Sequence, residues 1–383
     1  MIKIPFNKPA LTGNELRYME DAVARGKISG DGDYTRKCQK FLEKKFKCSK
    51  VLLTTSCTSA MEMAAILFDI QPGDEVIMPS YTFVSTANAF LLRGVKPVFV
   101  DIRPDTLNID EGLIDKNITA KTKAVIPVHY AGVSCELDTI LDICSKRGIY
   151  VLEDAAQGIN SLYKNRYLGT VGDLGAFSFH ETKNVISGEG GALLVNNERF
   201  RERAEIIWEK GTNRKKFFRG EVDKYTWIDI GSSYLMSDLL AAYLFAQLEN
   251  LDKIQRKRKK IWDLYRQHLA ELEEEGKLRL PAVPRNCVPN YHLFYILLPD
   301  RRRRDTLLRR LKEAGIHAVF HYVPLHTSPM GLKLGYRPGD LPRTESLSER
   351  VIRLPLFFDL SVGEAESIVS AVKREIDTAP SPA

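Results

Sequence analysis

Two residues of this 383-residue chain, Asp154 and Lys183, stand where acid–base or covalent chemistry is expected. Asp154 lies in the segment 153–157 and closes an apolar run, and open α/β sheets bind ligands at the carboxyl ends of their strands. Lys183 follows the aromatic run 175–179 and precedes the glycine cluster 188–191, a place where burial can lower the pKa of an amine. Taken singly, a helix-capping aspartate and a surface lysine are the more ordinary interpretations.

Two further segments offer groups that could hold an anion and an aromatic ring. The segment 55–60 is rich in hydroxyl side chains and joins a strand pattern to a helical pattern. Free N–H groups and the helix dipole at such a position favour a phosphate, although an ordinary helix cap explains the segment equally well. The segment 79–88 places aromatic rings at the end of the next strand, where core packing is the alternative.

The four features together are more specific than any one of them. They provide a phosphate cradle, an aromatic face, a carboxylate and an amine, in chain order along successive strand ends. This is the set of groups that holds pyridoxal 5′-phosphate (PLP). We therefore expect PLP as cofactor.

The elements that must position these groups alternate along the chain. Strand patterns and intervening helical patterns occur at 51–55, 61–68, 75–79, 86–92, 97–101, 124–128, 137–145 and 150–154. Continuous Val, Ile and Leu runs predict a mostly parallel central sheet that is covered on both faces. The strands 175–179 and 191–195 have no full helix between them, so we expect an antiparallel pair at the edge of the sheet.

The rest of the chain predicts a second, smaller α/β domain. A long helix over 236–272 ends the large domain, which we place at residues 1–275, and the small domain covers 276–383. The small domain should contain strands at 291–298 and 317–322 and helices at 305–314 and 363–376, before a frayed tail at 378–383. The first segment, 1–30, is expected to pack with it.

Composition excludes several classes of protein. The chain is 44% hydrophobic and 27% charged, which excludes wholesale disorder, and no apolar run is long enough to span a membrane. The six cysteines have no close pair, so we expect neither a metal site nor disulfides, and the N-terminus lacks a signal core, so we expect a cytoplasmic protein. The basic runs 256–260 and 301–304 supply much of the net charge of +7; we assign them to solvated helix faces and expect no nucleic-acid partner.

Several segments of the chain resemble those of a known family. The segments 73–77, 153–157, 177–184 and 188–191 resemble those of the DegT/DnrJ/EryC1/StrS family, which are fold-type I, PLP-dependent sugar aminotransferases. The resemblance runs nearly end to end and includes 321–326 and 354–356. Three segments, 80–90, 210–214 and 223–227, are most similar to the dTDP-4-amino-4,6-dideoxygalactose transaminases, which act on dTDP-4-oxo-6-deoxy-D-glucose.

The resemblance implies a role for each site residue. Lys183 would be the lysine that attaches the cofactor, and Asp154 would pair with its pyridine nitrogen. The remaining cofactor contacts would be Gln157 near the phenolic oxygen, Phe83 on the ring, and Thr58, Ser59 and Ser178 on the phosphate. One segment departs from the family pattern: Ser233 and Leu235 stand where relatives commonly have Asn and Arg.

The resemblance also implies substrates and a partner. The substrates would be L-glutamate and a dTDP-sugar, with Arg219, Lys224, Tyr322 and His326 as candidate substrate-binding residues. Relatives build each active site from two chains, so we expect a homodimer with shared sites. The segment 213–227 is predicted to be an inserted hairpin that reaches the partner's pocket.

Three alternatives stay open at the level of sequence. The enzyme could aminate C3 instead of C4, or it could be a PLP-dependent dehydratase; relatives of that second kind have histidine in place of Lys183, and His180 lies three residues earlier. The third alternative is a scaffold that has lost PLP. The sequence does not determine the sugar, the configuration of the new amine or the pathway.

Overall fold

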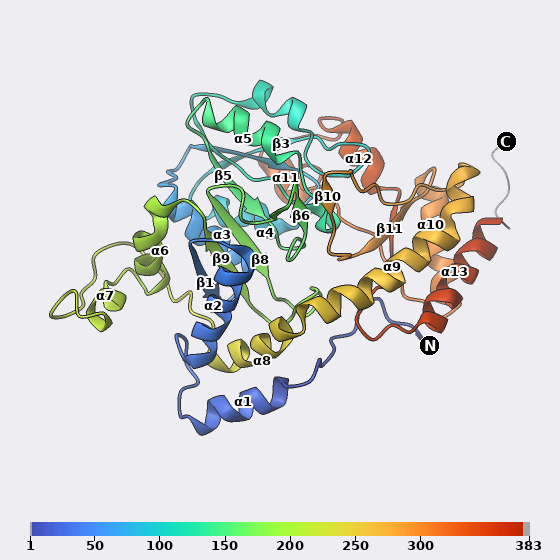
Figure 1. The fold of residues 1–383 in the computed structure, drawn as a ribbon. Helices are drawn as coiled ribbons and strands as arrows, with labels where there is room; N and C mark the ends of the chain where they lie inside the picture. The colour runs from blue at the N-terminus through green and yellow to red at the C-terminus, as the bar shows by residue number, and fades with distance from the viewer. Residues whose placement is uncertain (1, 378–383) are drawn as a thin grey trace.

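The chain folds around one twisted sheet, as the computed structural model of residues 2–377 shows (Figure 1). Its seven strands, in spatial order, are β1 (Lys50–Thr54), β9 (Gly191–Val195), β8 (Leu174–Ser178), β5 (Tyr150–Asp154), β4 (Thr122–Val125), β2 (Glu75–Pro79) and β3 (Lys96–Val100). All neighbours are parallel except those of β9, which is antiparallel to both β1 and β8. The predicted mostly parallel sheet is confirmed. The antiparallel pair is also confirmed, but β9 is not at the edge, because β1 pairs outside it.

Helices cover both faces of the sheet, as alternation along the strands requires. Leu52 and Leu193 pack on one face with α3 (Cys57–Leu67), α4 (Val84–Leu91) and α6 (Arg201–Trp208). Val51 and Leu194, one residue away on each strand, pack on the other face. That face is covered by α1 (Glu15–Ala24), α2 (Asp33–Phe46), α5 (Leu137–Ser145) and α8 (Asp238–Glu249).

A second core gathers the C-terminal elements. The antiparallel pair β11 (Phe294–Leu297) and β12 (Val351–Leu354) packs with α10 (Arg301–Glu313) and α13 (Val362–Asp377). The shorter strands and α-helices are β6 (Leu162–Tyr163), β7 (Arg166–Tyr167), β10 (Cys287–Val288), α7 (Arg214–Phe218), α11 (Pro329–Lys333) and α12 (Pro342–Ser348). The predicted strand at 317–322 is wrong: only Val319 forms a bridge, to Arg353. The tail at 378–383 lies outside the described residues.

One long helix, α9 (Leu251–Glu274), contributes to both cores, and Figure 1 shows it running from α8 to α10 and α13. Ile254 packs with the sheet, whereas Ile261 and Leu269 pack in the C-terminal core. The predicted helix over 236–272 is therefore two helices, separated at Asn250, whose side chain donates to the carbonyl of Ala246 at 3.0 Å. The domain boundary at residue 275 stays a prediction.

The two ends of the N-terminal segment lie in different places. Ile4 forms a bridge with Ile316 and packs in the C-terminal core. Ala22, on α1, instead packs in the core between the sheet and α8. Only the first residues of the segment therefore contact the elements of the expected small domain.

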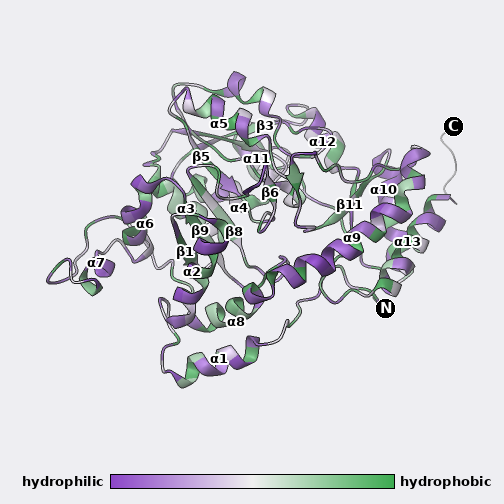
Figure 2. Ribbon diagram, viewed as in Figure 1, coloured by the Kyte–Doolittle hydropathy of each residue, from purple (hydrophilic) through white to green (hydrophobic). Residues whose placement is uncertain are grey.

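The basic runs lie mostly in solvent, as expected. In Figure 2 the middle of α9 is hydrophilic, whereas α8 is largely hydrophobic. Arg258 is the exception on α9, because it is buried and its guanidinium donates to the carbonyls of Tyr291 and His292. No helix within residues 2–377 is long and apolar enough to cross a membrane.

A buried carboxylate fixes the chain behind the carboxyl end of β5. Glu153 is fully buried and accepts four hydrogen bonds: one from His129 Nε2 at 2.9 Å and three from the backbone of the loop 169–172, at 2.6 to 2.8 Å. His129 Nδ1 in turn accepts from the backbone N–H of Cys135. Because every donor is matched, the loops on either side of β5 are held to one point.

We expect Glu153→Ala to lower the free energy of unfolding by about 3–5 kcal/mol, because it leaves several buried donors without an acceptor. Urea denaturation followed by circular dichroism measures the change. Glu20→Ala, at an exposed position of α1, is the control and should change the value by about 0.5 kcal/mol or less. A Glu153→Ala protein as stable as this control would contradict the role of the carboxylate.

Candidate active site

A cavity of about 840 Å³ lies at the carboxyl ends of the central strands. Asp154 and Ser178, the last residues of β5 and β8, both line it, and Thr82 lines it just beyond β2. Lys183 lines the same cavity from the loop after β8, and Tyr322 from a C-terminal loop that packs against Tyr81 and Tyr130. The structure thus brings together residues that are far apart in the sequence, such as Phe6, Asp154 and Leu356.

The Asp154 carboxylate is held in one orientation. Its Oδ2 accepts from Thr86 Oγ1 at 2.7 Å, and its Oδ1 accepts from the backbone N–H of Ala156 at 3.1 Å. Thr86 Oγ1 is also 2.8 Å from Thr82 Oγ1. The side chain is 4% exposed, so this carboxylate presents a fixed negative charge to the cavity and can pair with a protonated ring nitrogen.

Lys183 is partly buried in a tight loop between β8 and β9. Its backbone N–H donates to the carbonyl of His180 at 2.9 Å. Burial lowers the pKa of its amine; the neighbouring Cys57 and Asp154 oppose this shift, and the positive charge of Arg353 adds to it. A larger neutral fraction makes the amine a better nucleophile and proton acceptor than a free lysine.

Hydroxyl groups line the wall where two helices begin. Ser56 caps α3 by accepting from the N–H of Ser59, and Thr58 Oγ1 donates to Ser85 Oγ at 2.8 Å, near the start of α4. A Cβ at Gly191 would collide with the backbone of Ser56, so the glycine allows β9 to approach the start of α3. Two helix N-termini with their hydroxyl groups could hold a phosphate.

Gln157 and Tyr322 connect the sheet with a C-terminal loop. Gln157 Oε1 accepts from the N–H of Ala131 at 2.7 Å, and its Nε2 donates to the Tyr322 hydroxyl at 3.0 Å. Burial raises the pKa of Tyr322, so its phenol stays protonated and can donate into the cavity. Phe83 is 58% exposed, and its ring centre lies 6.4 Å from that of Tyr322. Of the residues predicted from sequence, the cavity therefore brings together Lys183, Asp154, Gln157, Ser178, Thr58, Phe83 and Tyr322.

Four predicted residues do not line the cavity, and two of them, Ser59 and His326, are held by other parts of the protein. The Ser59 hydroxyl lies 2.8 Å from Thr55 Oγ1 and 3.0 Å from Ser56 Oγ, within the turn that starts α3. His326 is fully buried, with Nδ1 2.7 Å from Ser80 Oγ and Nε2 3.0 Å from Glu345 Oε1. Both ring nitrogens of His326 are thus engaged by the protein itself.

The expected hairpin at 213–227 is wrong in form. The segment contains the short helix α7 and is closed by a single bridge between Thr212 and Trp227, and Figure 1 shows it projecting from the body as an arm. Arg219 pairs with Glu221 at 2.6 Å and with Glu205 at 2.8 Å, whereas Lys224 is exposed. Neither residue lines the cavity of its own chain.

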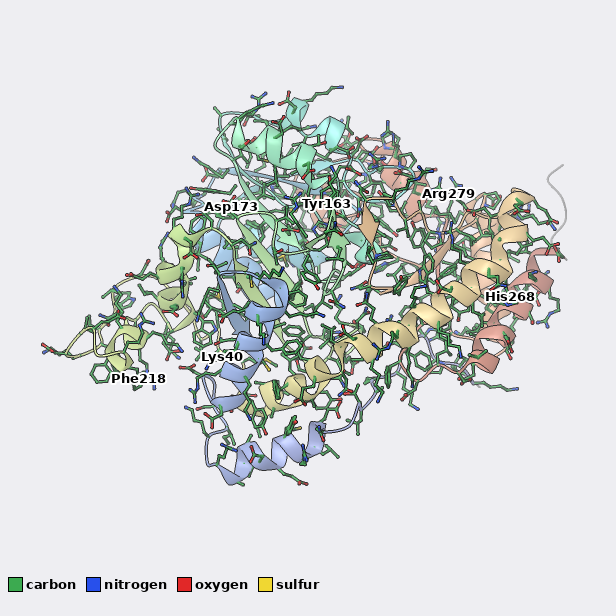
Figure 3. The ribbon with its side chains drawn as sticks, in the orientation of Figure 1. Lys40, Tyr163, Asp173, Phe218, His268 and Arg279 are labelled. Carbon is green, nitrogen blue, oxygen red and sulfur yellow. The ribbon has the colours of Figure 1, made fainter. Side chains whose placement is uncertain are left out.

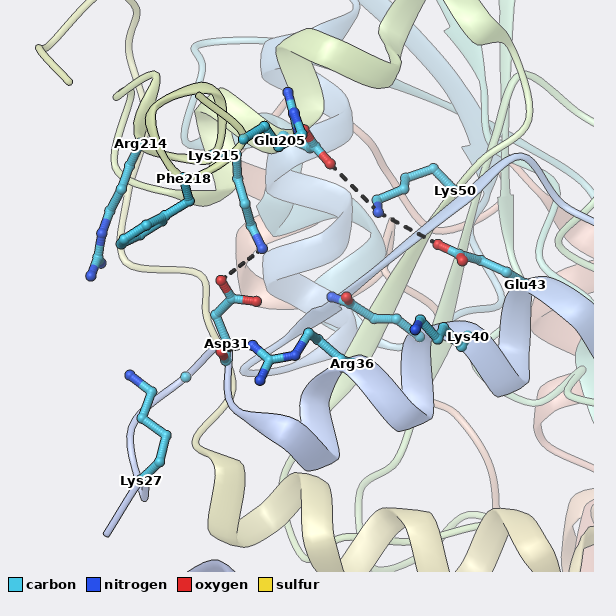
Figure 4. A pocket seen from close by; sticks show the side chains of 13 residues that line it. Lys27, Asp31, Arg36, Lys40, Glu43, Lys50, Glu205, Arg214, Lys215 and Phe218 are labelled. Atoms are coloured by element: carbon cyan, nitrogen blue, oxygen red, sulfur yellow. Dashed lines mark hydrogen bonds and ion pairs between the residues drawn. The ribbon is translucent and has the colours of Figure 1, made fainter. Parts of the chain in front are cut away.

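The arm is anchored at its base. A second cavity, of about 530 Å³, lies between α2 and α7 (Figure 4). Across it Lys215 pairs with Asp31 at 2.7 Å, and Lys50 bridges Glu43 and Glu205. Figure 3 shows Phe218 on the projecting part of the arm, away from Tyr163 in the body. The ion pairs hold the root of the arm while its aromatic tip stays exposed.

Sequence reasoning missed several residues of the site. Thr86 and Ser85 lie in the segment that the aromatic pattern had indicated, but the pattern did not show that their hydroxyls face Asp154 and Thr58. His292 also lines the cavity, and its Nδ1 is 2.9 Å from Asn184 Oδ1. Because Asn184 Nδ2 donates to the carbonyl of Asn290, its Oδ1 accepts, and His292 therefore carries its proton on Nδ1. Burial lowers the pKa of His292, which keeps the ring neutral.

The donor set fits PLP. A fixed carboxylate for the ring nitrogen, an amine of lowered pKa, a hydroxyl wall at two helix starts and an aromatic ring at the rim all face one cavity. The model of the DegT/DnrJ/EryC1/StrS aminotransferase family matches residues 9–373. The chain belongs to this family.

Similar proteins match nearly the whole chain. It is 33% identical to the uncharacterized protein MJ1066 of Methanocaldococcus jannaschii (97% of each chain) and 31% identical to the spore coat polysaccharide biosynthesis protein SpsC of Bacillus subtilis (97% of this chain, 96% of the relative). Among solved structures, DesV of S. venezuelae superposes with a TM-score of 0.91 at 27% identity, covering 99% of this chain and 100% of its own.

The cofactor and the fold follow from these comparisons. Spr1654 of Streptococcus pneumoniae has been solved in a PLP form and a PMP form; the PMP form superposes with a TM-score of 0.92 at 26% identity and covers 98% of this chain and 99% of its own. The chain is a fold-type I, PLP-dependent aminotransferase, as the sequence predicted. PLP, when bound, supplies the electron sink for the reaction.

The lowered pKa of Lys183 has a measurable consequence for stability. We expect Lys183→Met to stabilise the cofactor-free protein at about pH 6 and to do so much less at about pH 10. At the lower pH folding must bury a charged amine; as the pH rises between the lowered pKa and the ordinary value of about 10.4, the folded state loses its proton first and the wild type gains stability. Each unit of lowering corresponds to about 1.4 kcal/mol.

Urea denaturation of the cofactor-free proteins at the two pH values measures this difference. Lys260→Met, at an exposed position of α9, is the matched control and should show no pH-dependent gain. An equal effect of Lys183→Met at both pH values would contradict burial of the charged amine.

Proposed function

We propose that this aminotransferase moves the amino group of L-glutamate to C4 of a dTDP-4-oxo-6-deoxyhexose, giving a dTDP-4-amino-4,6-dideoxyhexose. The observation that carries the proposal is the placement of Lys183 and the Asp154 carboxylate in one cavity. Its volume of about 840 Å³ is at the upper end of small-molecule sites and supports a substrate as large as a nucleotide sugar. The segments 80–90, 210–214 and 223–227, which resemble C4 transaminases, support the choice of sugar.

In this proposal Lys183 moves the protons. Its Nζ takes a proton from the α-carbon of glutamate in the first half-reaction, and delivers a proton to C4 of the sugar in the second. Asp154 keeps the ring nitrogen of the cofactor protonated, and Thr58 and Ser178 hold the phosphate. Gln157 would lie beside the phenolic oxygen, where its amide is already oriented by the Tyr322 hydroxyl. Phe83 would cover the ring and exclude water.

A dehydratase is less well supported by the same cavity. The residue that would replace a lysine in that chemistry is histidine, and here the position is occupied by Lys183. His180 is partly exposed; its Nδ1 is 2.9 Å from Thr182 Oγ1 and its Nε2 is 3.8 Å from Glu189. The structure of the product shows whether the enzyme aminates C3 or C4 of the sugar.

Incubation with dTDP-4-oxo-6-deoxy-D-glucose, L-glutamate and PLP, followed by NMR of the product, tests the proposal. We expect an amine at C4 and one 2-oxoglutarate for each sugar aminated. In Lys183→Ala the protein should stay folded while turnover falls by several powers of ten, because proton transfer alone contributes roughly 10²–10⁴-fold.

The outcomes separate the alternatives. An amine at C3, or loss of a hydroxyl without amination, would replace the proposed reaction with one of its rivals. Borohydride reduction of the wild type should leave the cofactor on the peptide that contains Lys183; a label on another lysine, or near-normal turnover of Lys183→Ala, would refute the assigned role.

We also propose a homodimer in which each site uses both chains. The support is the arm at 213–227, where large apolar side chains are left in solvent: Phe218 is 64% exposed, Tyr225 53% and Trp227 78%. Exposed rings next to Arg219 and Lys224 suit an anionic substrate in the partner's pocket, and two-fold pairing is the commonest symmetry.

We also propose that the protein is cytoplasmic, and its six free cysteines support this location.

Mixing two inactive variants tests the shared site. Chains with Lys183→Ala and chains in which residues 215–226 are replaced by a short glycine linker should each be inactive, whereas their mixture should recover activity, because one site of each heterodimer has both intact parts. Mixing two preparations of Lys183→Ala is the control and should recover none. A monomer by light scattering, or verified heterodimers without activity, would contradict the shared site.

A further inference from the structure

An arginine of the C-terminal core lines the cavity that contains Lys183. Arg353 lies in β12, partly buried, and its backbone is held on both sides by pairing with Tyr295 of β11 and with Val319. Neither its type nor its position attracted attention in the sequence. Arg353 and Lys183 are the two Lys or Arg side chains of the described residues that line this cavity.

The guanidinium group of Arg353 is poorly satisfied by the protein. Its Nε is buried without any hydrogen-bond acceptor. Among residues 2–377, its terminal nitrogens make a single hydrogen bond, to the carbonyl of Phe320 at 3.4 Å, near the limit for such a bond. Within residues 2–377 it forms no ion pair with a carboxylate, and the titratable groups that act on it are the phenols of Tyr130, Tyr322 and Tyr81. A buried guanidinium whose N–H donors lack acceptors lowers the stability of the fold, unless a ligand supplies those acceptors.

The carboxylates of the same cavity are committed elsewhere. Asp154 accepts from Thr86 and from the backbone of Ala156. Glu189 is 68% exposed and lies 3.8 Å from His180. Neither forms an ion pair with Arg353, so the protein leaves this cation for something that enters the cavity.

A purely packing role explains less. The guanidinium carbon lies 4.6 Å from the centre of the Phe6 ring, which also lines the cavity, and this contact covers one face of the planar group. It does not use the N–H donors, which lie in the plane at its edge. Arg350, three residues earlier, shows the contrast: its Nε donates to the carbonyl of Leu298 at 2.7 Å, and it does not line the cavity.

We propose that Arg353 binds a carboxylate of the amino-acid donor, an inference that rests on the function proposed above. The planar fork of a guanidinium matches a carboxylate with two parallel hydrogen bonds, and the Phe6 ring would keep the fork in place. The donor therefore enters with its carboxylate on the C-terminal core and its amine toward Lys183.

Position favours the donor over the diphosphate of the nucleotide sugar. The donor's α-carboxylate is attached to the carbon that carries the reacting amine, so its anchor must lie close to Lys183. The positive charge of Arg353 contributes to the lowered pKa of Lys183, which agrees with such closeness. The diphosphate, by contrast, is attached to C1, across the sugar ring from the reacting C4.

Binding of glutarate, a dicarboxylate without an amine, tests the proposal independently of turnover. Isothermal titration of the PLP-loaded protein should show roughly 10- to 100-fold weaker glutarate binding in Arg353→Met, with a smaller loss in Arg353→Lys, which keeps the charge but not the fork. Arg350→Met is the matched control and should bind glutarate like the wild type. Binding of dTDP should be unchanged in all three variants.

Steady-state kinetics should agree, with KM for L-glutamate raised by a similar factor and KM for the sugar unchanged. The proposal is overturned if the wild type does not bind glutarate, if Arg353→Met and Arg353→Lys both bind it normally, or if dTDP binding is lost instead, which would assign the residue to the diphosphate. The PLP absorption spectrum and the melting temperature identify a variant that has not folded. If Arg353→Met does not fold, glutarate binding by Arg353→Lys tests the proposal instead. If glutarate binding depends on Arg353 but the sugar is not aminated, the result contradicts the proposed sugar substrate and still supports Arg353 as the binding site for the donor carboxylate.

Discussion

The carboxylate of Glu153 is the interaction on which the geometry of the site depends. It is fully buried, and it closes four hydrogen bonds with His129 and the loop 169–172. Successive side chains of a strand point to opposite sides, so the next residue, Asp154, faces the cavity. Holding the back of β5 in this way fixes the position of the carboxylate that we propose as the partner of the cofactor's ring nitrogen.

The cavity is assembled from two cores that meet at the ends of the strands. The sheet contributes Asp154, Ser178 and the loop of Lys183, whereas Arg353 comes from the C-terminal core and Tyr322 from a C-terminal loop. The hydrogen bond from Gln157 to Tyr322 joins the two sides. This arrangement divides the tasks: the sheet side would hold the cofactor, and the C-terminal side would receive the substrates that we propose.

The charged side chains that line the cavity favour anionic ligands. Lys183 and Arg353 are cations, and burial lowers the pKa of both, while Asp154 is already held by Thr86. An empty site with this balance is costly for the folded protein. The phosphate and the carboxylate that we propose at the helix starts and at Arg353 would offset that cost, and their binding would then stabilise the fold.

The sequence by itself determined the strands and the two central residues. Continuous apolar runs are local signals, and Asp154 and Lys183 stand directly beside such runs, so their placement at the strand ends followed. The sequence did not predict the contacts between distant segments. Thr86 contacts Asp154 across 68 positions, and His326 is enclosed by Ser80 and Glu345. Only the tertiary structure decided these, because a side chain's partner depends on which elements pack against it, and local pattern does not contain that information.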